Sequence, residues 1–148
     1  MENGFYIVEN LSSITPDENS LIAKIDASKI QNMDDFYAVF NEYFQFPDYF
    51  GENTEAFYEL MNDLDWLEKS SFIILIQNYD ALLQSDKDDK LMCLEMLYQT
   101  ALDWQEVPNF EGEEEFREVA EFKIYIEKNS SILEDLKEME ITEGVYIL

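Results

Sequence analysis

A turn rich in aromatic residues leads into an acidic segment between Phe46 and Glu59. On helical spacing, one side of this segment is apolar and would face a core, through Phe57, Leu60, Met61 and Leu64. The opposite side carries Glu55, Tyr58, Glu59 and Asn62, with no basic residue among them. A merely solvated helix face usually mixes charges of both signs. Carboxylates around a large aromatic side chain instead predict a surface that binds a cationic groove on another protein.

Most catalytic constellations are excluded because the chain contains no histidine. Ser-His-Asp and Cys-His arrangements and His-based zinc sites all require this residue. With 34 Asp and Glu residues, carboxylate pairs are so abundant that they single out no acid–base site. Neither a glycine–lysine phosphate loop nor a GxGxxG motif is present. We therefore expect a protein that is not an enzyme, with no catalytic residue and no cofactor.

Neither the acidic runs nor the single cysteine predicts a reactive site. The runs 86–89 and 111–115 are rich in carboxylates, but neither has the central Gly and terminal Glu of an EF-hand loop. We interpret both as solvated charge and expect no metal site. Cys93 lies in an apolar helical pattern without a base to activate it, so we expect a buried structural thiol.

Composition predicts a folded, strongly acidic protein. The 148 residues are 47% hydrophobic, which is enough to bury a core, so we expect a single domain over 1–148. Nine basic residues against 34 acidic ones give a net charge of −25, which repels nucleic acid and anionic membranes. No segment approaches the roughly 20 apolar residues of a membrane span, and the first residues do not resemble a secretory signal. With one cysteine and no internal disulfide, we expect a cytoplasmic protein.

Strands and helices alternate along the chain, which predicts an α/β fold with a largely parallel sheet. The predicted strands are Phe5–Val8, Leu21–Asp26, Ser71–Gln77, Phe122–Glu127 and Gly144–Leu148. The first of them could be an edge strand. The two terminal strands either pair with each other or extend an edge of the sheet.

Helices are expected between these strands. One begins after an N-cap at Asn32, and the acidic helix begins after Asn53 or Thr54 and continues to about Trp66. A long helix ends near Trp104, and a short one covers 132–139. The segment 107–120 is predicted as an acidic loop with a short helix over 114–119.

The turn and the segments around it resemble the barstar family of ribonuclease inhibitors. The most specific part is the string Pro47-Asp48-Tyr49-Phe50-Gly51-Glu52-Asn53, because few turns require all of those residues. Flanking matches are Ile25–Ile30, Asp35–Tyr37, Glu55–Phe57 and Asn62–Trp66. The resemblance covers about residues 21–128, and Gly4–Tyr6 is similar to longer family members. It implies a barstar-like three-stranded parallel sheet packed with helices, plus N- and C-terminal extensions, the latter over 129–148.

The resemblance also implies a function, because family members bind a ribonuclease in the producing cell and block its active site. The two helix acids that occupy the phosphate-binding groove of the nuclease correspond to Glu55 and Glu59. The family commonly has Asp at both positions, and Trp where this chain has Tyr58. A further acid on the last helix of the family has no clear match near Thr100, and Asp103 could substitute for it.

We therefore predict a partner-binding surface made of Tyr49, Gly51, Asn53, Glu55, Tyr58, Glu59 and Asn62. Its partner would be a basic ribonuclease toxin, the protein an immunity protein, and a monomer is favoured. Gly51 is expected to adopt a backbone angle that most residues cannot, and Asn53 would serve equally as a helix cap. Tyr49 is expected to be exposed. Two alternatives stay open: an acidic module for a basic partner that is not a nuclease, and a carboxylate-dependent enzyme.

Overall fold

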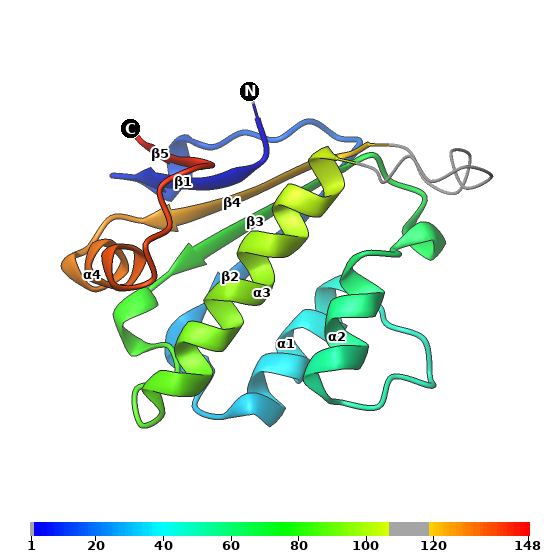
Figure 1. Ribbon diagram of the computed structural model, residues 1–148. Coiled ribbons are helices and arrows are strands. Elements are labelled where there is room, and N and C mark those ends of the chain that lie inside the picture. The colour runs from blue at the N-terminus through cyan, green and yellow to red at the C-terminus, as the bar shows by residue number, and fades with distance from the viewer. Residues whose placement is uncertain (1, 107–118) are drawn as a thin grey trace.

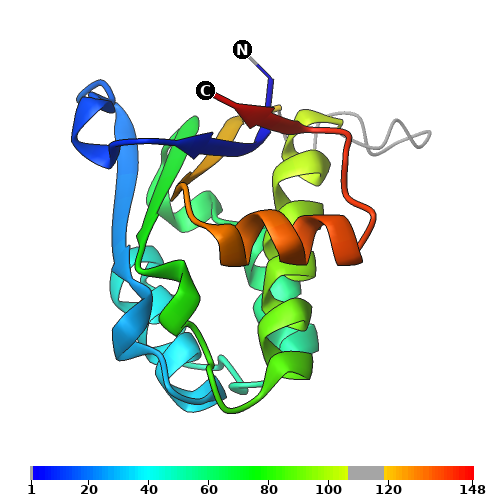
Figure 2. The ribbon, with the colours of Figure 1, turned by 90° about the vertical axis from the view of Figure 1, so that its left-hand side faces the viewer.

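A computed structural model describes residues 2–106 and 119–148. Within them, five strands form one parallel sheet in the order β2-β3-β4-β1-β5. The strands are β1 Gly4–Val8, β2 Ser20–Asp26, β3 Ser71–Gln77, β4 Glu121–Glu127 and β5 Val145–Ile147. The sheet is strongly twisted, so that β1 and β2 run in clearly different directions (Figure 2). The predicted α/β fold with a parallel sheet is confirmed, and β2, β3 and β4 are its three predicted core strands.

The two terminal strands widen this core on the β4 side. β1 pairs with β4 and also with β5, so the terminal strands both pair with each other and extend the sheet. The prediction of Phe5–Val8 as an edge strand is wrong, because β1 lies inside the sheet and all of its residues are buried. Its unbroken apolar run is the pattern of a strand covered on both faces.

Helices cover one face of the sheet (Figure 1). They are α1 Met33–Phe44, α2 Thr54–Met61, α3 Lys87–Gln105 and α4 Ser130–Glu138. The main core lies between them and the sheet, whereas the opposite face carries a smaller cluster around Tyr6 and Tyr125, covered by Leu11 and Ile14. No helix of the described residues has the length and apolar character needed to cross a membrane.

The acidic helix ends earlier than predicted. α2 stops at Met61 instead of about Trp66, because Leu64 adopts a left-handed conformation with a φ of 55° that no helix can contain. A separate 3-10 turn follows over Asp65–Leu67, and the indole of Trp66 donates to the carbonyl of Phe44 at 2.8 Å. The short helix predicted over 114–119 lies almost wholly outside the described residues, and Val119, the one described residue of that range, is not helical.

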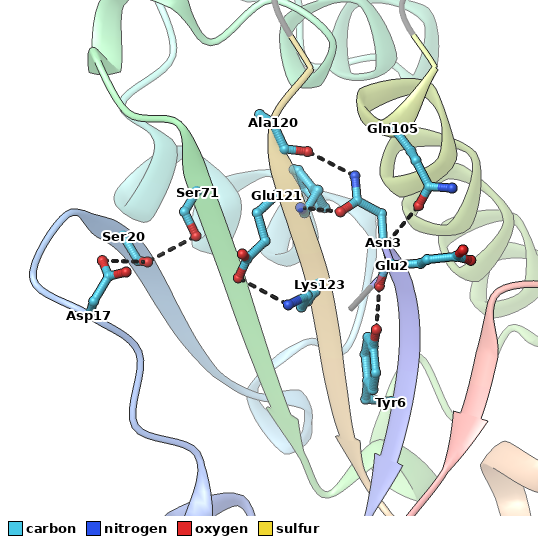
Figure 3. Close-up of polar contacts among 11 residues, drawn as sticks. Glu2, Asn3, Tyr6, Asp17, Ser20, Ser71, Gln105, Ala120, Glu121 and Lys123 are labelled. Atoms are coloured by element: carbon cyan, nitrogen blue, oxygen red, sulfur yellow. Dashed lines mark hydrogen bonds and ion pairs between the residues drawn. The ribbon is translucent and has the colours of Figure 1, made fainter.

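Asn3, just before β1, fastens that strand to its neighbours (Figure 3). Its side-chain Nδ2 donates to the carbonyls of Ala101 at 3.1 Å and Ala120 at 2.8 Å, and its Oδ1 accepts from the N–H of Phe122 at 2.9 Å. The side chain is buried and satisfied at both ends, so one amide joins α3, β4 and β1.

A buried ion pair fastens α4 to α3. Nζ of Lys90 lies 2.7 Å from Oδ2 of Asp135, and the phenol of Tyr79 donates to the same carboxylate oxygen at 2.8 Å. Asp135 is only 5% exposed, so these two partners replace the water that would otherwise stabilise its carboxylate. The ammonium of Lys90 also lies 5.2 Å from the centre of the Tyr79 ring.

Candidate partner-binding surface

The position of α2 is set by Phe57, which is completely buried. Its ring packs against those of Phe36 and Phe40 of α1, with centroid distances of 5.0 Å and 5.4 Å, and against Phe46 at 5.9 Å. Burying one aromatic side chain contributes about 1.5–3 kcal/mol. Because this face of the helix is fixed in the core, the opposite face, with Glu55 and Glu59, points away from it.

The two aromatic residues of the turn before α2, Tyr49 and Phe50, differ in their exposure to solvent. The N–H of Phe50 donates to the carbonyl of Pro47 at 3.0 Å, which closes the turn. The Phe50 ring packs on Tyr37 and Phe46, with centroid distances of 5.6 Å and 4.8 Å. Tyr49 is 76% exposed, so its predicted exposure is confirmed. The turn therefore presents a large amphipathic side chain to solvent.

Gly51 does not take the unusual backbone angle predicted for it. The left-handed residue of the turn is its neighbour Glu52, with a φ of 48°. A Cβ at position 51 would lie 3.1 Å from Nδ2 of Asn53, so space rather than backbone angle is what glycine supplies. Asn53 is the N-cap of α2, and its Oδ1 accepts from the N–H of Ala56 at 2.8 Å.

Glu55 and Glu59 lie one helical turn apart on the exposed side of α2. Like charges at this spacing destabilise a helix by a few tenths of a kcal/mol. In the described part of the chain, neither carboxylate makes an ion pair. Glu55 lies in the first turn, where the helix dipole favours a negative charge. Among the described residues, the pair can thus accept a cation from a partner.

Tyr58 lies between these acids and is partly buried. Its phenol donates to the carboxylate of Asp103 on α3. Thr100, the position nearest to the missing family acid, is completely buried and donates to the carbonyl of Met96 at 2.7 Å. Asp103 is therefore the acid of α3 that reaches this surface, and it does so through Tyr58.

Asn62 terminates α2 and is half-buried. Its Nδ2 donates to the carbonyl of Tyr58 at 3.0 Å, and its own N–H reaches the carbonyls of Tyr58 and Glu59, both at 3.2 Å. These bonds satisfy carbonyls that the helix end would leave open. The structure therefore places Asn62 beside the other predicted site residues in a capping position.

A groove between α2 and α3 adds residues that the sequence did not predict. It measures about 450 Å³ and is lined by Thr54, Glu55, Tyr58, Glu59, Met92 and Met96. Met92 and Met96 are four residues apart on α3 and form the apolar side of the groove. The four-residue spacing of the two methionines is visible in the sequence. The apolar stripe of Leu91, Leu94 and Leu97 is stronger, however, and indicates only that α3 packs on a core.

The described residues offer no metal-binding cluster, and their one cysteine is not a reactive thiol. Within 2–106 and 119–148, no three His, Cys, Asp or Glu side chains gather closely enough to hold a metal ion. Cys93 is completely buried, and burial raises the pKa of its thiol well above the usual range. The predicted structural thiol is confirmed.

Comparison with known proteins agrees with this arrangement. The family described as Barstar (barnase inhibitor) matches residues 21–127, well over half of the chain. No curated protein matches it significantly. The matched segment begins in β2, ends at the last residue of β4 and includes the whole exposed turn and α2. The chain therefore belongs to the barstar family.

Proposed function

We propose that the protein binds a basic ribonuclease toxin and blocks its active site, acting as an immunity protein in the cytoplasm. The observation that carries this proposal is the pair Glu55 and Glu59, which are exposed one turn apart with Tyr58 between them. The family supplies the class of partner, because it is described as a barnase inhibitor.

The mechanism follows from the chemistry of a ribonuclease site, where basic side chains hold the phosphates of RNA. Glu55 and Glu59 take the places of two phosphates and accept charge-assisted hydrogen bonds, which are about twice as strong as neutral ones. Tyr49, which is exposed on the preceding turn, and Tyr58 fill space that bases would occupy. The toxin is blocked by occupancy, without any covalent step.

The net charge acts before contact. A charge of −25 attracts a basic partner over a distance and raises the association rate, by about 10- to 1,000-fold in steered complexes. Fast capture protects the RNA of the cell while an active toxin is present. The same charge repels RNA itself, so the inhibitor does not compete for the substrate.

The test uses immobilised wild type and the double variant Glu55→Ala/Glu59→Ala. A matched control, Glu18→Ala/Glu134→Ala, removes two exposed carboxylates outside α2 and leaves the net charge equal. Each immobilised protein is incubated with basic proteins of the source cell, and separately with the product of the gene next to the one that encodes this chain. Captured protein is then assayed for RNA cleavage with and without each variant.

We expect the wild type and the control to capture and inhibit a ribonuclease, and we expect the α2 double variant to do neither. Capture of a basic protein that cleaves no RNA would overturn the inhibitor assignment in favour of an acidic binding module. Equal capture by all three proteins would place the interface outside α2.

A further inference from the structure

We propose that a hollow on the face of the sheet opposite the helices binds a small amphipathic anion, such as a medium-chain carboxylate. The hollow measures about 550 Å³ and shares no lining residue with the groove between α2 and α3. Its main lining residues are Leu11, Ile14, Lys24, Asp26, Lys29 and Leu75. The inference goes beyond the proposed function, because this second binding site requires no ribonuclease.

The hollow lies at the carboxyl ends of two neighbouring parallel strands. Asp26 is the last residue of β2 and Gln77 is the last residue of β3. The two residues are paired in the sheet, and both line the hollow. In open α/β sheets, ligands commonly bind outside the carboxyl ends of the strands. The hollow is thus placed where a sheet of this class offers a binding site.

Apolar side chains provide room for the body of such a ligand. Leu75 of β3 is 7% exposed, and Leu11 and Ile14, from the segment between β1 and β2, are partly buried. All three belong to the small apolar cluster on this face of the sheet. The volume lies within the roughly 300–1,000 Å³ range of ligand pockets, so a short alkyl chain fits. Each methylene group that it buries should strengthen binding about four-fold.

Two lysines provide positive charge for the head of the ligand. Lys24 lies on β2 and Lys29 ends the 3-10 turn Ala27–Lys29, and both side chains are exposed. In the described part of the chain neither lysine makes an ion pair, although acidic residues outnumber basic ones by 34 to nine. Both ammonium groups can therefore pair with an anion that enters the hollow.

Asp26, the one acid among the lining residues, does not depend on these lysines. Its Oδ1 accepts from Nδ2 of Asn78 at 2.9 Å, and from the hydroxyl and N–H of Ser28 at 2.6 Å and 3.0 Å. These bonds hold the pKa of Asp26 below its usual value, and the nearby charge of Lys29 adds only a smaller effect. Because neutral donors stabilise this carboxylate, the lysines stay available to a ligand.

Other small occupants fit the hollow less well. A cationic amphiphile would meet two like charges, and a neutral one would gain nothing from the ammonium groups. The net charge of −25 repels anions in general, but salt at 0.1 M screens that repulsion beyond about 10 Å. A preference for an anion would therefore have to come from the lysines of the hollow.

The test titrates ¹⁵N-labelled protein with octanoate, octanol and octylammonium in 0.1 M NaCl and follows the amide signals by NMR. Lys24→Met/Lys29→Met keeps the apolar stems and removes both charges. Lys69→Met/Lys137→Met removes the same charge at two exposed lysines outside the hollow, and is the matched control. Leu11→Trp fills part of the hollow. The amide spectrum of each variant shows whether it is folded.

We expect octanoate to shift the signals of residues that line the hollow. It should bind about five- to ten-fold more tightly than octanol, since exposed ion pairs are individually weak, and octylammonium should bind most weakly. Lys24→Met/Lys29→Met should abolish the preference for octanoate, whereas the control should keep it. Leu11→Trp should weaken the binding of octanoate and octanol alike.

The outcomes that would overturn the inference need no ribonuclease. Equal affinity of the wild type for octanoate and octanol would overturn the anion site, even if every variant were unstable. The same preference in Lys24→Met/Lys29→Met as in the wild type would remove the lysines from it. Signals that shift only outside the hollow, or no shift up to 10 mM octanoate, would overturn the site itself.

Discussion

The phenol of Tyr58 on α2 donates a hydrogen bond to Oδ2 of Asp103 on α3. This bond joins the helix that carries the exposed acids to the longest helix of the described residues. We propose that Asp103 acts as a positioning residue, because its carboxylate accepts from the phenol of Tyr58, which lines the groove.

Asp103→Ala should weaken ribonuclease binding by about 1–2 kcal/mol, because Tyr58 then loses the acceptor that orients it. Asp103→Asn keeps an oxygen acceptor and removes the charge. We expect the Asn variant to retain most of the affinity, measured as the dissociation rate. Equal losses of affinity in both variants would indicate that the partner interacts directly with the charge of Asp103.

Single truncations in the acidic face should have large effects. Glu59→Ala and Tyr58→Ala are each expected to weaken binding by more than about 2 kcal/mol, as truncations of central interface residues do. Glu18→Ala, on the exposed loop before β2, should change the association rate only slightly. Surface plasmon resonance with the captured ribonuclease measures both rates. Small and equal effects at all three positions would contradict an interface on α2.

Salt should stabilise the free protein. With a net charge of −25, repulsion among carboxylates opposes the folded state, and ions screen that repulsion over about 10 Å at 0.1 M. We expect the melting temperature to rise between 10 mM and 500 mM NaCl. A melting temperature that falls with salt would show that local ion pairs outweigh the repulsion.

Removing one partner of the buried ion pair should be strongly destabilising. Asp135→Ala leaves the ammonium of Lys90 and the phenol of Tyr79 without their shared carboxylate. Breaking such a pair costs about 3–5 kcal/mol of the free energy of unfolding, measured by urea denaturation. Lys90→Met/Asp135→Leu should regain part of that loss, because an apolar pair leaves no buried charge and only the buried phenol of Tyr79 stays without its acceptor. If the double variant is no more stable than Asp135→Ala, the loss lies in packing.

Stability should fall in alkali because of Tyr6. Burial raises the pKa of its phenol from 10.0 to about 12, with further contributions from the stacked rings of Tyr146 and Tyr125. The unfolded chain loses this proton near pH 10, so the contribution is fully present below pH 10 and is lost as the pH rises through 12. It amounts to about 3 kcal/mol. Tyr6→Phe cannot ionise, and its free energy of unfolding should fall less between pH 10 and 12. Parallel curves for both proteins would refute this assignment.

Much of the fold and of the α2 surface could be predicted because short-range patterns determine them. The 3.6-residue period places Phe57 inside and Glu55 outside, and the side chains of Asn53 and Thr54 both predict a cap, which the structure places at Asn53. These features depend on residues within a few positions of one another.

The features that were missed depend on distant residues. Tyr58 and Asp103 are 45 positions apart, and no local pattern indicates that they meet. The groove beside Met92 exists only because α2 lies against that side of α3. In the same way, the apolar run of β1 indicates that both of its faces are covered, but it does not reveal that β4 is its neighbour.

That interior position has a consequence for synthesis of the protein. Gly4 pairs with Lys123, so 119 positions separate the two residues. At about 5–20 residues per second, a ribosome needs roughly 6–24 s to cover that distance. β1 is made before the other strands, yet its neighbours emerge last, whereas β2 and β3 can pair much earlier. The sheet is therefore completed in its interior only when translation of these residues is nearly finished, after β2 and β3 have had time to pair.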